Sequence, residues 1–174
     1  PNIPEAFVAV LACSSLGAIW SSCSPDFGSR GVLDRFSQIE PKVLIAVDGY
    51  HYGGKAFDRR ANIAELQAEL PTLQKTILIQ STATTGGTVA DAVSLAAQTV
   101  DWQQLLSSIA PDVALRFEQV PFDHPLWILY SSGTTGLPKP IVHSHGGVII
   151  EHSKQITLHN DLGAGDRFFW YTST

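Results

Sequence analysis

The 174-residue sequence contains no methionine and has only two cysteines, Cys13 and Cys23. Their ten-residue spacing fits neither a metal clip nor a disulfide framework, so we expect two buried, reduced thiols. The sequence has no apolar run near the roughly 20 residues that a membrane span needs, and its first residues lack the features of a signal peptide. These absences argue against a disulfide-built secreted domain and an integral membrane protein, and they predict a cytoplasmic location.

Positive charge is also scarce, with 11 lysines and arginines against 16 acidic residues and a formal net charge of −5. Surfaces that hold nucleic acid or anionic lipid carry clustered basic residues, and here the basic residues are scattered. We therefore expect neither nucleic acid nor a membrane as a partner. The sequence begins at Pro1 and stops directly after an apolar stretch, "RFFWYTST". From this we expect an interior piece of a longer protein, with the rest of its own chain as a partner.

Apolar periodicity predicts alternating helices and strands over most of the chain. A continuous apolar run at 42–48 predicts a strand buried on both faces, and 75–80 is a second such run. Residues 56–71 between them have helical spacing, which completes a βαβ unit with a right-handed crossover and a parallel sheet. The remaining predicted helices are 4–17, 29–41, 101–111 and 147–163, and the remaining predicted strands are 18–25, 126–132, 140–145 and 166–172. The sequence therefore predicts one layered α/β domain, with its weakest signal over 81–120.

The stretch "YSSGTTGLPKP", residues 130–140, follows the predicted strand 126–132. Ligands of open α/β sheets bind at the ends of such strands. Glycines allow successive backbone N–H groups to turn toward an anion, the hydroxyls donate further hydrogen bonds, and the lysine supplies a mobile positive charge. This combination predicts a phosphate-binding loop.

The same loop has two other interpretations, a Walker loop and a plain surface turn. The Walker loop, aligned on Gly133 and Lys139, requires glycine at position 138 and serine or threonine at position 140, and both positions are proline. The loss of the hydroxyl after the lysine removes the group that would hold Mg²⁺, so a Walker-type phosphotransferase is disfavoured. Serine, threonine, glycine and proline are also common in surface turns. A turn alone does not require a serine pair, a threonine pair and a lysine together.

The loop resembles the phosphate-binding signature of the AMP-forming acyl-CoA synthetases, which belong to the adenylate-forming enzymes. The segments "IPEAFVAVLACSSLGAIWSSCSPDFG", "RFSQIEPKVLIAVDGY" and "VHSHGGVIIEHSK" are similar to successive segments of the short-chain branch of that family. The resemblance implies a layered parallel-sheet α/β domain of the adenylate-forming type. It also implies that residues 1–174 form part of the N-terminal AMP-binding domain, with no complete second domain because the C-terminal domain is absent.

The implied activity is a two-step ligation. A short carboxylic acid attacks ATP to give an acyl-adenylate and pyrophosphate, and the thiol of coenzyme A then displaces AMP. The expected cofactors are ATP, Mg²⁺ and coenzyme A as co-substrate. Acetoacetate is the expected acid, and acetate or propionate are the alternatives. Adenylation without transfer to coenzyme A and a nucleotide-binding remnant without chemistry are further alternatives. Residues 1–174 alone are expected to be inactive.

The family motif maps onto this sequence residue by residue. The implied ATP-phosphate-binding residues are Ser131, Ser132, Gly133, Thr134, Thr135, Gly136 and Lys139. Thr134 and Lys139 are the implied catalytic residues, and Thr134 is also associated with Mg²⁺. Pro140 departs from the glycine that is common after the lysine, and its fixed φ should stiffen the loop exit.

The resemblance implies further contacts elsewhere in the chain. Ser24, Asp26 and Lys55 are candidates for binding coenzyme A, although His51 stands where the family pattern has an arginine. For Lys55 the alternative is an ordinary solvated lysine. Trp170 is the candidate wall of the acyl pocket, and the alternative is a buried aromatic strand.

The pair His143 and His145 would share one face of an extended segment. No third ligand lies nearby, so we expect these histidines to be packing groups, or groups that support the residues near the nucleotide, rather than metal ligands.

Overall fold

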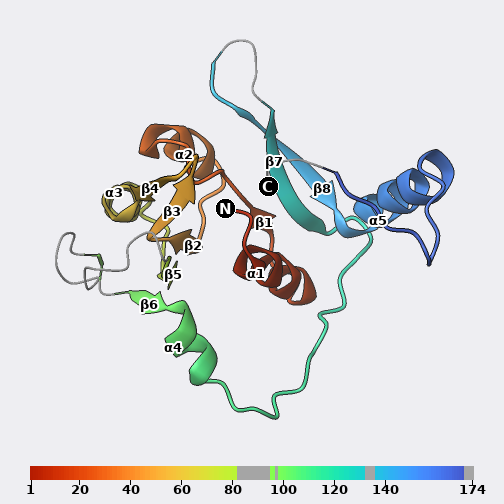
Figure 1. Ribbon diagram of the computed structural model, residues 1–174, viewed down its shortest axis with the longest axis horizontal. Helices are drawn as coiled ribbons and strands as arrows, with labels where there is room; N and C mark the ends of the chain where they lie inside the picture. Colours follow the sequence, from red (N-terminus) through yellow and green to blue (C-terminus); the bar gives the residue numbers. More distant parts are fainter. Residues whose placement is uncertain (82–94, 97, 132–135, 171–174) are drawn as a thin grey trace. The chain divides into compact units, whose positions relative to one another are not determined.

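The computed structural model describes residues 1–81, 95–96, 98–131 and 136–170 (Figure 1). The chain divides into two compact units. The first unit contains Pro1, Cys23–Ala114 and Gly133–Pro138, and the second contains Asn2–Ser22, Leu115–Ser132 and Lys139–Thr174. Within the described part of the chain, no helix has the length and apolar character needed to cross a bilayer.

The first unit is built on a parallel sheet, as the sequence predicts. Its strands are β2 (Val43–Val47), β5 (Lys75–Ile79) and β6 (Thr99–Asp101), in the order β2-β5-β6, and both neighbouring pairs are parallel. Helix α3 (Arg60–Glu69) connects β2 to β5, which confirms the βαβ unit. The expected burial of β2 on both faces is only partly observed, since Val43 is 52% exposed while Leu44 and Val47 are buried.

Helix α2 (Ser29–Phe36) packs with α3 against this sheet. The core cluster consists of Val32, Phe36, Leu44, Leu66 and Leu70. Polar contacts add to the apolar core: Gln67 on α3 donates to the hydroxyls of Thr76 and Thr99, at 2.9 and 2.8 Å. Because Thr76 is fully buried, the sheet depends on Gln67 to satisfy this hydroxyl.

Two strands form a hairpin where the sequence predicted the start of a long helix. Strands β3 (Gly49–Tyr52) and β4 (Lys55–Asp58) pair antiparallel, and α3 begins only at Arg60. The turn consists of Gly53 and Gly54, with φ values of 56° and 75°. A pair of glycines is the sequence signal of a two-residue hairpin turn, because glycine readily adopts positive φ. The strand after this turn, β4, includes residue 56, so the prediction that the helix starts there was wrong.

Strand β6 was also missed, and α4 (Trp102–Ser107) follows it directly. The Asp101 carboxylate accepts a hydrogen bond from the backbone N–H of Gln104, which caps the start of α4. The helix predicted over 101–111 is therefore real but shorter, and its first predicted residue is its N-cap.

The second unit contains the two strands that flank the loop of interest. Its elements are α1 (Pro4–Ser15), β1 (Trp20–Ser21), β7 (Pro125–Ser131), β8 (Lys139–Ser144), α5 (His145–Lys154) and the π-helical turn η2 (Gln155–His159). Strand β7 pairs in parallel with β1 and antiparallel with β8. The single helix predicted over 147–163 is thus a regular helix that begins earlier and continues as a π-helical turn.

The strand predicted over 166–172 is not observed at residues 166–170, and residues 171–172 lie outside the described part of the chain. Phe168, Phe169 and Trp170 are 57%, 83% and 72% exposed. A strand requires a neighbour for its backbone hydrogen bonds, and within the described residues no strand pairs with this segment. The apolar pattern of this segment was therefore not enough to predict a strand.

The N-terminus of α5 is covered by the ring of Phe122. The backbone N–H of Gly146 donates to the Phe122 carbonyl at 2.9 Å. A Cβ on Gly146 would lie 2.2 Å from Cδ2 of Phe122, so this position has no room for a side chain. By contrast, a Cβ on Gly31 in α2 would meet its nearest neighbour, Cβ of Phe27, at an ordinary 3.8 Å.

The two cysteines are free thiols, each half-buried rather than fully buried as the sequence predicted. Burial raises the pKa of Cys13, and it raises the pKa of Cys23 from 9.0 to about 11, while the nearby Arg35 charge acts weakly in the opposite direction.

We expect Gly146→Ala and Gly31→Ala to change stability in opposite directions. The first substitution forces the Phe122 ring away and should lower the free energy of unfolding by roughly 1–3 kcal/mol. The second removes glycine from a helix interior and should raise it by about 0.5–1 kcal/mol. Thermal unfolding of the complete protein measures both. Equal melting temperatures for the two variants would contradict the packing described at Gly146.

We expect Cys23 to react with iodoacetamide about 100-fold more slowly in the folded protein than in the unfolded chain at pH 8, because the thiolate fraction falls about tenfold per pKa unit. Since the folded pKa is raised, the stabilisation from the neutral thiol is complete below pH 9 and is lost as the pH rises toward 11. Mass spectrometry of the labelled peptide gives the rates. Equal rates in the folded and unfolded protein would contradict the burial of Cys23.

Candidate functional site

The hairpin of β7 and β8 fixes the two ends of the predicted phosphate loop. Ser131 at the end of β7 lies opposite Lys139 at the start of β8, and Tyr130 lies opposite Pro140. Directly opposed residues of an antiparallel pair have Cβ atoms about 4.5–5.5 Å apart. The register therefore brings together two residues, Ser131 and Lys139, that the sequence assigned to phosphate binding. The loop follows a strand and returns into a second strand, β8, which agrees with the strand predicted over 140–145.

The described part of the loop has constrained backbone geometry and an available charge. Gly136 has a φ of 92°, which a residue with a side chain rarely adopts. Lys139 is exposed, and within the described residues no carboxylate forms an ion pair with its amine. Its charge is therefore available to an anion. The predicted site residues Ser132, Gly133, Thr134 and Thr135 lie outside the described residues.

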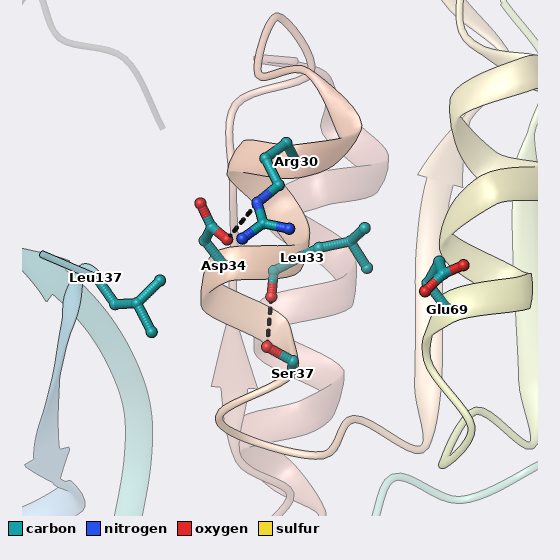
Figure 2. A pocket seen from close by; sticks show the side chains of 6 residues that line it. All are labelled: Arg30, Leu33, Asp34, Ser37, Glu69 and Leu137. Atoms are coloured by element: carbon teal, nitrogen blue, oxygen red, sulfur yellow. Dashed lines mark hydrogen bonds and ion pairs between the residues drawn. The ribbon is translucent and has the colours of Figure 1, made fainter.

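The exit of the loop belongs to the first unit, where it lies near α2. The side-chain amide of Gln38 donates a hydrogen bond to the carbonyl of Pro138 at 2.9 Å. Leu137 and residues of α2 line a pocket of about 270 Å³. The six lining side chains, drawn in Figure 2, are Arg30, Leu33, Asp34, Ser37, Glu69 and Leu137. An ion pair of 2.8 Å joins Arg30 to Asp34 along the helix. Leu137 is 57% exposed, so the hydrogen bond, and not apolar packing, holds the exit of the loop against α2.

The structure brings together two of the three residues predicted to bind coenzyme A. The Ser24 hydroxyl donates a hydrogen bond to the carboxylate of Asp26. This bond is the main cause that lowers the pKa of Asp26, and the charge of Arg59 adds a smaller effect in the same direction. The carboxylate is thus anionic at neutral pH. It repels a phosphate, so any role in ligand binding must be that of an acceptor for a hydroxyl or amine.

Lys55, the third predicted residue, lies in the β3–β4 hairpin opposite Tyr52 and is exposed. In the part of the chain that the structure describes, no hydrogen bond or ion pair joins Lys55 to Ser24 or Asp26.

The hairpin that carries Lys55 is held by a side chain that sequence reasoning missed, Arg59. Tyr50 and Phe57 stack across the hairpin with their ring centroids 5.2 Å apart. The Arg59 guanidinium lies 5.2 Å from the Tyr50 ring and donates to the Tyr50 hydroxyl at 2.8 Å. The signal was present in the alternating aromatic pattern "YHYGGKAF" around two glycines, which is typical of a hairpin with paired aromatics.

Trp170 and the histidines lie in the second unit. Trp170 is exposed and its ring stacks on Phe168 at 6.4 Å, so the described residues do not enclose an acyl pocket around it. His143 accepts a hydrogen bond from the indole N–H of Trp127 at 2.9 Å. The Nε2 atom of His145 is buried and has no hydrogen-bond partner among the residues that the structure describes. Among the described residues, no group of three or more metal-ligating side chains gathers in one place.

A comparison with protein families identifies the class to which this fold and loop belong. The family described as "AMP-binding enzyme" matches residues 1–174, which is the whole chain. The chain therefore belongs to the AMP-binding enzyme family, and the resemblance noted in the sequence is confirmed.

Two similar proteins from different organisms carry the same name in two spellings. The chain is 45% identical to "Acetoacetyl-coenzyme A synthetase" of Rhizobium meliloti (strain 1021) over 99% of its length, and 44% identical to "Acetoacetyl-CoA synthetase" of Gallus gallus over 100% of it. It covers 26% of each of these proteins.

A solved structure, "Acetoacetyl-CoA Synthetase from Streptomyces lividans", is 59% identical with a TM-score of 0.86, and the match covers 100% of this chain and 25% of that one. The predicted α/β fold of the adenylate-forming type is thus confirmed, and the chain spans about a quarter of the length of its relatives.

Proposed function

We propose that the chain is part of the N-terminal AMP-binding domain of an AMP-forming acid–thiol ligase that joins acetoacetate to coenzyme A. The observation that carries the proposal is the similarity of the whole chain to proteins named acetoacetyl-CoA synthetase, at up to 59% identity for a solved structure. The cytoplasm is the proposed location, and the free thiols of Cys13 and Cys23 agree with a reducing compartment.

The loop geometry supports a role in the first half of this reaction. A carboxylate oxygen of the acid attacks the α-phosphorus of ATP, the bond to the bridging oxygen breaks, and pyrophosphate leaves with the electron pair. No covalent enzyme intermediate is needed, so catalysis depends on positioning and on stabilising the charge of the leaving group. The ammonium of Lys139, which has no ion-pair partner among the described residues and is held opposite Ser131 by the hairpin, suits this task.

The remaining assignments follow the family motif. We propose that Ser131, Ser132, Gly133, Thr134, Thr135, Gly136 and Lys139 hold the β- and γ-phosphates. Mg²⁺ would reside near Thr134 and supply further positive charge to the polyphosphate. The positive φ of Gly136 and the available charge of Lys139 fit such an anion.

Coenzyme A is proposed to lie near Ser24, Asp26 and Lys55. In this arrangement Lys55 supplies the positive charge for a phosphate of the ligand, and Asp26 accepts a hydrogen bond from it. Trp170 remains the proposed contact of the acyl group.

We expect the complete protein to exchange labelled pyrophosphate into ATP only when an acid is present, and fastest with acetoacetate. The exchange is the reverse of acyl-adenylate formation, so it tests the proposed half-reaction directly. Acetate and propionate, offered separately, are the matched comparisons. A faster exchange with either would assign the protein to a different short acid. If none of the three acids supports exchange although ATP binds, only a nucleotide-binding role is left. Residues 1–174 alone should give no exchange.

Lys139→Ala should lower this exchange about 100- to 1,000-fold, which is the range observed when one preorganised electrostatic group is removed from an active site. The matched control is Lys42→Ala, which removes another exposed lysine, directly before β2, and should leave the rate within about twofold. Unfolding curves of both variants separate a loss of charge from a loss of structure. A well-folded Lys139→Ala variant with normal exchange would remove Lys139 from the catalytic residues.

A further inference from the structure

Gln38, two residues beyond the end of α2, contacts the residue that directly precedes Lys139 in the chain. Its side-chain nitrogen Nε2 donates to the Pro138 carbonyl at 2.9 Å and to the Asp34 carbonyl at 2.7 Å. A side-chain amide nitrogen carries two hydrogens, so both bonds can form at once. Asp34 lies in the last turn of α2, where backbone carbonyls lack partners within the helix. The amide of Gln38 therefore connects the end of α2 to the exit of the loop.

The backbone around this hydrogen bond has little freedom left. Pro138 and Pro140 each have a fixed φ, and a residue that precedes proline is restricted to extended conformations. Lys139 is such a residue, and it begins β8 in the extended state. Gly136 has a φ of 92°. The ψ angle of Pro138, which sets the direction of its carbonyl, is still free to vary at the exit of the loop. The hydrogen bond from Gln38 fixes the direction of this carbonyl.

We propose that Gln38 is a positioning residue for the phosphate-binding loop, because its amide holds the Pro138 carbonyl and so preorganises the loop for the phosphates of ATP. This inference rests on the proposed function of the loop. Gln38 does not touch the reacting atoms. Its effect is on the fraction of molecules whose loop is ready to bind, and the apparent affinity for ATP falls in proportion to that fraction.

The substitution that tests the proposal is Gln38→Met in the complete protein. Methionine has a similar length and helix propensity and no hydrogen to donate. The net value of one hydrogen bond corresponds to roughly a three- to tenfold change in an equilibrium constant. We therefore expect the dissociation constant and the KM for ATP to rise roughly three- to tenfold, with kcat and the KM for the acid unchanged.

The split between these constants separates positioning from a merely structural role. A general loss of folded protein would lower kcat and leave both KM values unchanged. The matched control is Gln103→Met, an exposed glutamine on α4, which should leave all four constants within about twofold of the unsubstituted protein. The proposal is overturned if Gln38→Met keeps the ATP dissociation constant of the control, or if the KM values for ATP and acid rise together.

Direct binding of labelled ATP, measured by equilibrium dialysis, keeps this test independent of the ligase chemistry. If the unsubstituted protein shows no acid-dependent pyrophosphate exchange, the proposed function fails. The effect of Gln38→Met on ATP binding still decides the role of Gln38 in that case. Weaker ATP binding by this variant alone supports the positioning role, and equal binding by both variants rejects it.

Discussion

The antiparallel ladder between β7 and β8 is the constraint on which the candidate site depends. It sets Ser131 opposite Lys139, so that a hydroxyl and an ammonium group lie at the base of one loop although other residues separate them in the sequence. A slip of one residue in this ladder would turn every side chain to the other face of the sheet. The position of the charge is therefore a property of the backbone hydrogen bonds, and the lysine needs no partner of its own to stay in place.

The first unit shows the same principle with different chemistry. Its parallel sheet is stabilised by an apolar core, and side chains of α3 give partners to two buried hydroxyls, since Gln67 bonds Thr76 and Asn62 bonds Ser29. The β3–β4 hairpin is too short to be stable by itself. The stacked rings of Tyr50 and Phe57, with the guanidinium of Arg59 beside them, supply the contacts that two isolated strands lack. Aromatic stacking and a cation near the ring face each contribute about 1 kcal/mol.

Much of this fold could be predicted from local sequence patterns, and the failures have physical reasons. The apolar runs of β2 and β5, with α3 between them, were predicted because burial in a parallel sheet leaves a continuous apolar run. Strand β6 was missed because it has only three residues, Thr99–Asp101, and they form no continuous apolar run. The strand expected at residues 166–172 failed for the opposite reason, since its aromatic pattern is suitable but the described residues offer no neighbouring strand.

For the site, residues of the loop could be identified from the order of their types, because the chemistry of phosphate binding is local to one stretch. Gln38 could not, because it acts through a partner that is distant in sequence. Arg59 was missed because the sequence predicted a helix over part of the hairpin that this side chain supports. A glutamine after a helix has no distinctive pattern. Its importance becomes visible only when the structure shows which carbonyl it contacts.

The proline after Lys139 has a consequence for the lifetime of the protein as well as for its geometry. An exposed loop tip is the usual place for a protease to nick a folded chain. Trypsin-like enzymes cut after lysine, but they cleave poorly where proline supplies the next nitrogen, because its ring obstructs the extended binding of the substrate. Lys139 is exposed and followed by Pro140. The chain can therefore display the positive charge of this lysine at the edge of a loop without offering the bond after it as a cleavage site.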